Sequence, residues 1–243
     1  MNPRGLGQPP AAGSLFDSGS GALYTDNVPF HFLYIMLKKL KRLEVQEKLI
    51  EHDFELFTPR EFCDLFDVSR GTASLFINTN LRSGLFVKLR NGFYIVKQSY
   101  VSNFFIANRL YQPSYVSLNT ALSHYGIIPE VVYTTTSVTT KITREYETPK
   151  GDFSYRRIKK EAFTGYGLQI IHKDKVLIAE PEKALADYLY FVDLKRLSLN
   201  DRLELRNINK SALIAYAKIF QRPGMLSLIK HIYVEYQKPG KIY

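Results

Sequence analysis

Four polar residues near the middle of the first half of the chain have side chains that can read base pairs. Arg70, Thr72, Ser74 and Asn78 follow one another within little more than two helical turns. Arginine can donate two hydrogen bonds to guanine, and asparagine can pair in the same way with adenine. Because the N-terminal part of a recognition helix meets the major groove, this spacing predicts contacts with base edges.

The distribution of charge around these residues also favours a nucleic-acid partner. No acidic residue lies between Asp67 and Glu130, whereas six basic residues do. Phosphates repel carboxylates, and a surface that faces only water usually mixes both signs. For one of the basic residues, Arg82, simple solvent exposure explains the position equally well. The side chains expected to contact phosphates or the minor groove are Arg82, Lys88, Arg90 and Asn91.

Residues suited to catalysis show no comparable pattern. Glu180 and Glu182 flank Pro181, where carboxylates favour the start of a helix. A nuclease would need acidic residues that converge on a metal ion, and no spacing supports such a site. The single cysteine and the scattered histidines suggest no metal centre. We therefore expect no enzyme, no cofactor and no metal. The residues that a nuclease site would draw on are Asp152, Glu161, Asp174, Glu180 and Lys183.

The elements that would position the base-reading residues follow from local signals. Apolar spacing predicts a helix over residues 37–50, and Thr58, Pro59 and Glu61 form the start signal of a second helix. Ser69 is placed to cap a third helix that ends near Gly84. Asn91-Gly92 separates two apolar runs, which indicates a hairpin. Three helices and a hairpin in this order predict a winged helix-turn-helix.

The second half favours a different architecture. A helix over 99–112 is expected to link the two halves, and strand-forming segments follow. Pro181 opens the first of three late helices. The expected fold class is α+β, with an N-terminal winged helix-turn-helix and a second domain that has a mostly antiparallel sheet and C-terminal helices. The predicted boundaries are 1–29 for a disordered tail, 30–98 for the DNA-binding domain, 99–112 for the linking helix and 113–243 for the second domain.

Composition agrees with these expectations. The 243 residues carry a formal net charge of +10, which is common in proteins that bind polyanions. Hydrophobic residues make up 45% and charged residues 23%, the balance of a soluble globular protein. No segment is long enough to span a membrane, and the start of the chain lacks the pattern of a secretory signal. The expected location is the cytoplasm.

Several segments, in their order and spacing, resemble the AbiEi family of antitoxins and transcriptional regulators from bacterial toxin–antitoxin systems. The resemblance spans about residues 40–191 and covers the end of the third helix with the hairpin, a linking helix, a strand–turn–strand core and a late helix. The segments are 81–94, Tyr115–Gly126, Thr136–Lys141, Thr148–Arg156 and Ala179–Asp187. The first residues of the chain match nothing in the family, and residues 156–160 are more basic than the family pattern.

The resemblance implies a two-part protein. Its winged helix would bind double-stranded operator DNA and repress its own operon, and its C-terminal domain would counter a nucleotidyltransferase-like toxin. Monomer and weak dimer, with or without cooperative binding to DNA, remain open. Six basic residues of the second half are candidates for contact with DNA, RNA or an acidic toxin surface, and a simple solvated face is an equal alternative. They are Lys141, Arg144, Arg156, Arg157, Lys159 and Lys160.

Two other classes of function stay open at this point. One is a winged-helix regulator that has no toxin and senses a ligand in its second domain, and a sizeable apolar pocket there would favour it. The other is a nuclease directed to DNA by the winged helix, and clustered carboxylates would favour that.

Overall fold

The computed structural model describes residues 40–236, so the predicted N-terminal tail lies outside the described residues. The first half contains α2 (Arg42–Glu51), α3 (Pro59–Phe66) and α4 (Arg70–Arg82). Thr58 and Glu61 form a reciprocal capping box at the start of α3, as their spacing predicts. The Ser69 hydroxyl accepts a hydrogen bond from the Thr72 backbone N–H and caps α4. The second and third predicted helices are therefore confirmed.

A small sheet follows these helices. Its strands are β1 (Leu56–Phe57), β2 (Phe86–Arg90) and β3 (Phe93–Val96), in the order β1-β3-β2, and all pairings are antiparallel. Asn91 and Gly92 form the tip of the β2–β3 hairpin, where Gly92 has a φ of 77°. Glycine adopts this left-handed conformation without steric cost, which is why this dipeptide marks a hairpin in the sequence.

Aromatic rings fill the core between the three helices and the small sheet. Phe57 packs edge-on against Phe86, with 5.1 Å between ring centroids, and Phe62 lies 4.5 Å from Phe66. Ala73 and Ile77 of α4 are buried in the same cluster. The i, i+4 spacing of these two residues therefore turns one face of α4 inward and leaves the opposite face to solvent.

The second half is built on a six-stranded sheet in the order β6-β7-β5-β4-β9-β8. Antiparallel and parallel pairings alternate across it, because β5 runs parallel to β7 and β4 runs parallel to β9. Three of the five pairings are antiparallel, in line with the expectation of a mostly antiparallel sheet, and the two parallel pairings were not predicted. The strands are β4 (Ser114–Val116), β5 (Thr135–Thr139), β6 (Arg144–Thr148), β7 (Gly151–Arg157), β8 (Tyr166–Ile171) and β9 (Asp174–Ala179).

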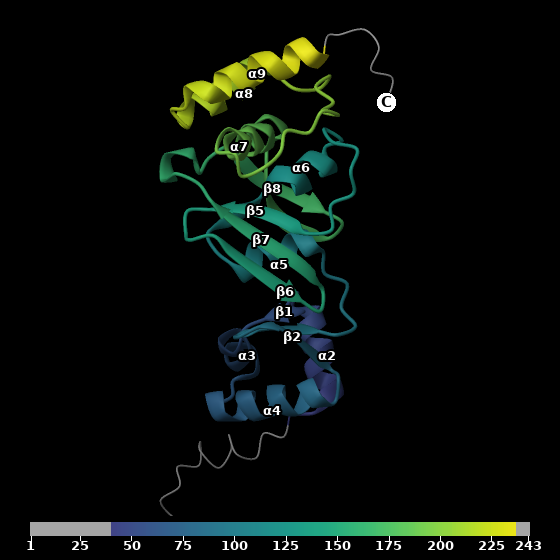
Figure 1. The fold of residues 1–243 in the computed structure, drawn as a ribbon. Coiled ribbons are helices and arrows are strands. Elements are labelled where there is room, and N and C mark those ends of the chain that lie inside the picture. Colours follow the sequence, from purple (N-terminus) through teal and green to yellow (C-terminus); the bar gives the residue numbers. More distant parts are fainter. Residues whose placement is uncertain (1–39, 237–243) are drawn as a thin grey trace, which may run out of the picture.

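Helices pack against this sheet and beyond it. The late helices α7, α8 and α9 lie at the end of the molecule opposite α4 (Figure 1). The fold class is α+β, as expected. The helices of this half are α5 (Asn103–Leu110), α6 (Leu118–His124), α7 (Pro181–Asp193), α8 (Lys210–Ile219) and α9 (Pro223–Tyr236), with a short 3-10 turn at Lys160–Ala162.

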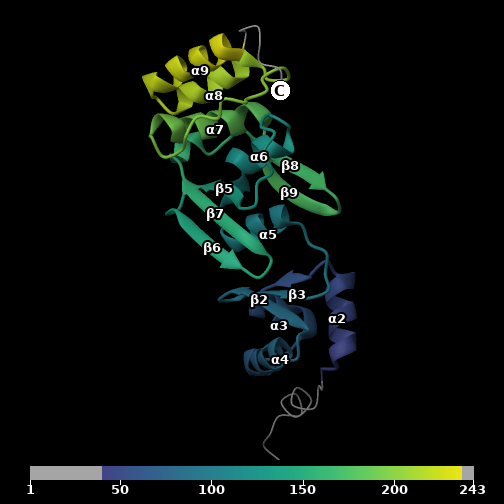
Figure 2. The same ribbon diagram turned by 45° about the vertical axis from the view of Figure 1, so that its right-hand side comes forward.

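The two halves share part of their hydrophobic packing. Leu56, Leu89 and Ile95 of the small sheet are buried in the same cluster as the core of the second half. We call these three residues the apolar junction. Ile106 and Leu110 of α5 are fully buried in that cluster too, so the expected linking helix belongs to the larger core. The small sheet accordingly lies between α4 and the six-stranded sheet (Figure 2).

None of the helices within residues 40–236 is both long and apolar enough to cross a membrane.

Candidate nucleic-acid interface

One broad face of α4 is turned away from the rest of the molecule. Arg70, Ser74, Asn78 and Arg82 are all exposed on it, and Figure 1 shows α4 at the far end of the first half. Ala73 and Ile77 fix this orientation because they are buried on the opposite side of the helix. The amide of Asn78 donates to the Ser74 hydroxyl over 3.4 Å, so these two side chains lie together on the surface. Four predicted contact residues thus share one accessible surface.

Thr72 is placed differently from the other predicted base readers. It is half-buried, and its hydroxyl lies 3.0 Å from the hydroxyl of Ser69, the capping residue of α4. Its backbone N–H is bound to that same hydroxyl. Thr72 therefore supports the start of α4 and does not share the outer face with Arg70 and Ser74.

Leu75 is a residue of this face that the sequence reasoning missed. Its side chain is 71% exposed, between Ser74 and Asn78 on the helix. An apolar side chain in the major groove can contact the methyl group of thymine. The sequence does indicate that Leu75 is exposed, because Leu75 lies outside the i, i+4 series of Ala73 and Ile77. An apolar residue in a helix is nevertheless usually assigned to the core.

The hairpin separates two residues that were expected to act together. Lys88 pairs with Tyr94 in the ladder, but the next pair is Arg90 with Phe93, so β2 has a bulge at Leu89. A bulge inserts one extra residue and breaks the alternation of faces. Lys88 is exposed, as expected for a phosphate contact. The prediction that Arg90 shares its face is wrong.

Arg90 is engaged with the second half of the molecule. Its Nε and Nη2 atoms donate to the carbonyl oxygen of Leu110 at 3.0 and 2.6 Å. The guanidinium also lies over the Phe93 ring, 4.1 Å from its centroid, and over the ring of Tyr146. Its donors are therefore used to fix the hairpin to α5. Asn91, at the tip, remains exposed.

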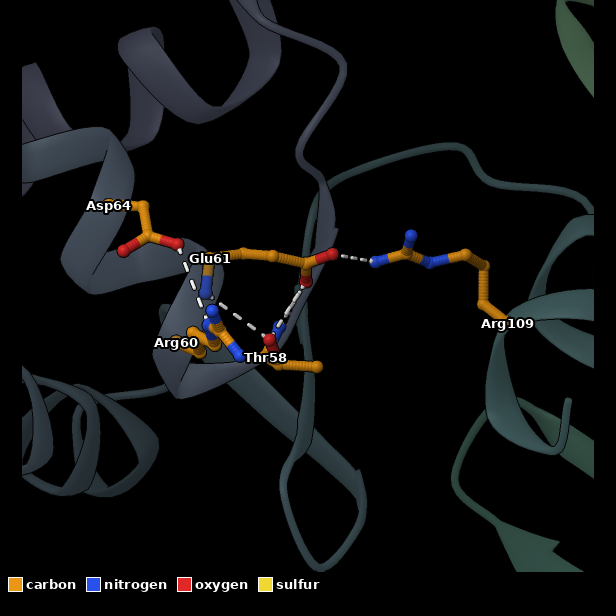
Figure 3. Close-up of polar contacts among 5 residues, drawn as sticks. All are labelled: Thr58, Arg60, Glu61, Asp64 and Arg109. Atoms are coloured by element: carbon orange, nitrogen blue, oxygen red, sulfur yellow. Dashed lines mark hydrogen bonds and ion pairs between the residues drawn. The ribbon is translucent and has the colours of Figure 1, made fainter.

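Arg109, another basic residue of the acid-free stretch, is also used inside the molecule. Its Nη2 atom lies 2.5 Å from Oε1 of Glu61, and Oε2 of Glu61 accepts from the Thr58 backbone N–H (Figure 3). The Glu61 carboxylate thus completes the cap of α3 and also binds Arg109 of α5. Burial raises the pKa of Glu61, but hydrogen bonds from Arg109 and Thr58 outweigh burial and hold the pKa below its ordinary value.

The basic residues of the second half do not form one patch. Arg156 and Arg157 are consecutive in β7 and point to opposite faces of the sheet. Arg156 lies over the Phe191 ring and lines a cleft with carboxylates, while Lys159 donates to the carbonyl of Phe220. The exposed members of the set are Lys141, Arg144, Arg157, Lys159 and Lys160.

The cleft beside Arg156 has a volume of about 310 Å³. Glu145, Glu147 and Asp152 line it together with Asn119. Carboxylates at this density make the cleft unsuited to a phosphate backbone. Charged side chains make up much of its lining, which does not match the apolar pocket expected of a ligand sensor.

The residues considered for a nuclease site are dispersed. Lys183 is fully buried and paired with Asp187, whose other oxygen accepts from Tyr115 and Ser117. Asp174 accepts from a backbone N–H, and Glu180 accepts from the Tyr216 hydroxyl. Within residues 40–236, no three His, Cys, Asp or Glu side chains gather closely enough to hold a metal ion.

A scan against protein-family models and a search among curated proteins give no match for this chain.

Proposed function

We propose that the protein binds double-stranded DNA, with residues 42–97 acting as a winged helix-turn-helix and α4 as the recognition helix. The observation that carries the proposal is the outer face of α4, where Arg70, Ser74 and Asn78 are exposed around Leu75. Arg82 at the end of α4 and Lys88 on the hairpin supply positive charge beside it, and no acidic residue stands between Asp67 and Glu130. Base reading and phosphate attraction are thereby combined on one end of the molecule.

We further propose that this binding serves a cytoplasmic antitoxin that represses its own operon. The support is the resemblance of residues 40–191 to the AbiEi family. In this proposal the second half counters a nucleotidyltransferase-like toxin.

DNA binding is tested with the full chain and a pool of duplexes in which one region is randomised. Arg70→Ala combined with Asn78→Ala should remove selective binding, because each good base contact contributes about 1–3 kcal/mol of discrimination. Arg206→Ala is the matched control, since this side chain is 78% exposed in the second half and also carries one positive charge. If Arg206→Ala and the double variant lose selective binding to the same extent, α4 is not the helix that contacts the bases.

The antitoxin proposal needs a separate measurement. The full chain is expressed with the nucleotidyltransferase-like toxin that this proposal places in the same operon, and both growth and promoter activity are recorded. The double variant at Arg70 and Asn78 should lose repression and still restore growth. Loss of both functions in a folded double variant would contradict the division of labour, and failure of the unaltered chain to restore growth would reject the antitoxin role.

A further inference from the structure

The two edges of the six-stranded sheet differ in the features that prevent pairing with another strand. The outer strand β6 has the sequence REYET, with charged residues at three of its five positions. Charges on an edge strand discourage association with other chains. The opposite edge, β8, has the sequence YGLQII, which carries neither charge nor proline. Only one of the two edges is therefore protected.

The geometry of β8 is regular over its whole length. All six residues pair with β9 in one register without a bulge. Figure 2 shows the β8–β9 hairpin at the margin of the second half, and within residues 40–236 no strand pairs with the outer side of β8. A regular edge of this kind presents backbone N–H and C=O groups in the positions that a further strand needs.

Apolar side chains on β8 are exposed beside this free edge. Leu168 is 61% exposed and Ile170 is 71% exposed. They are two residues apart in a strand, so they lie on the same face of the sheet. An aliphatic pair at an unprotected edge is unusual in a protein that exists only as a monomer, because edge strands normally carry residues that oppose association.

We propose that β8 pairs with β8 of a second copy of this chain in antiparallel orientation, with Gln169 at the two-fold axis. In this register Leu168 of each copy stands opposite Ile170 of the other, and residues directly opposite one another share a face. Four aliphatic side chains then form one cluster, and the two sheets become continuous.

The symmetry of this register supports a second copy as the occupant, because Leu168 and Ile170 each meet an aliphatic partner on an identical strand. A chain with a net charge of +10 repels itself over much of its surface. The uncharged β8 allows two copies to meet without opposing like charges within the pair. The contact is isologous, since the same residues are used on both sides, and such contacts close into a dimer. β8 belongs to the second half, whereas α4 lies at the far end of the first half (Figures 1 and 2). The inference does not depend on the proposed function.

The test measures the mass of the full chain in solution by sedimentation over a range of concentrations. Ile170→Lys places a charge opposite Leu168 at two symmetry-related positions, and it should raise the dissociation constant of the dimer by about tenfold or more. Val131→Lys is the matched control, because Val131 is 77% exposed and lies outside the sheet. This control should leave the dissociation constant unchanged.

Register is tested by mixing two charged variants. Ile170→Lys and Leu168→Glu each weaken self-association, but in the mixed dimer Lys and Glu stand opposite each other at one position, and Leu168 meets Ile170 at the other. Recovery of the dimer in the mixture supports this register. An unaltered chain that stays monomeric at its solubility limit overturns the proposal, as does equal weakening by Val131→Lys. Recovery of a complex only with an unrelated protein also overturns it.

Discussion

Replacing Arg90 by alanine should destabilise the protein and remove no phosphate contact from the proposed complex with DNA. The side chain donates two hydrogen bonds to the Leu110 carbonyl and lies 4.1 Å from the centroid of the Phe93 ring. Hydrogen bonds from a charged group contribute about 1.5–3 kcal/mol, and a partly exposed cation–π contact adds about 0.5–1 kcal/mol. Arg90→Ala should therefore lower the free energy of unfolding by about 2–4 kcal/mol.

Lys88 provides the matched comparison, because it lies two residues away in the same strand but is exposed on the other side of the bulge. Lys88→Ala should change the free energy of unfolding by no more than about 0.5 kcal/mol. It should instead reduce the slope of log affinity against log salt concentration by about 0.9 for one lost phosphate contact. Urea unfolding and salt-dependent fluorescence anisotropy with duplex DNA measure the two effects. A reduced salt slope for Arg90→Ala, with stability unchanged, would refute the assignment of Arg90 to the interior junction.

Three further outcomes follow from the same contacts. The pKa of Glu61 in the folded protein is held below its ordinary value. The contribution of its carboxylate to the free energy of unfolding is therefore complete above the pKa of the unfolded chain, and it is lost as pH falls through the lower pKa of the folded protein. The stability advantage of the unaltered chain over Glu61→Gln should therefore shrink in urea titrations as pH falls below the ordinary glutamate pKa of about 4.3, and a constant difference would contradict this. Ser69→Ala should lower the free energy of unfolding in the same assay by about 1 kcal/mol, because it removes the cap of α4. An unchanged midpoint of urea unfolding would count against the cap. A fragment that ends at Lys97 should retain DNA binding but self-associate through its exposed apolar junction, and a monomeric fragment at all concentrations would contradict that packing.

Local signals predicted the elements of the first half well, because each depends on a few neighbouring residues. Thr58, Pro59 and Glu61 mark the start of α3 through their own hydrogen bonds and backbone angles, and Ser69 does the same for α4. The turn at Asn91-Gly92 is specified by the conformational freedom of glycine. These features need no information from distant parts of the chain.

Features that depend on distant residues escaped the sequence analysis. The three-residue strand β4 was missed because it is short and gains its hydrogen bonds from β5 and β9. The bulge at Leu89 turns Arg90 toward the carbonyl oxygen of Leu110, 20 positions later in the sequence, which strand alternation cannot reveal. Arg109 looked like one more cation of an acid-free stretch, but its partner Glu61 lies 48 positions earlier in the sequence. Two of the eight expected DNA-contact residues, Thr72 and Arg90, therefore needed the three-dimensional structure for their correction.

Selection of binding sites from a randomised duplex pool tests the central claim most directly. The full chain is incubated with the pool, bound duplexes are sequenced, and the experiment is repeated with Asn78→Ala. We expect the unaltered chain to enrich a defined motif and the variant to lose preference at particular positions, with an adenine among the bases no longer selected. Absence of any motif, or an identical motif from the variant, would contradict the assignment of α4 as the recognition helix.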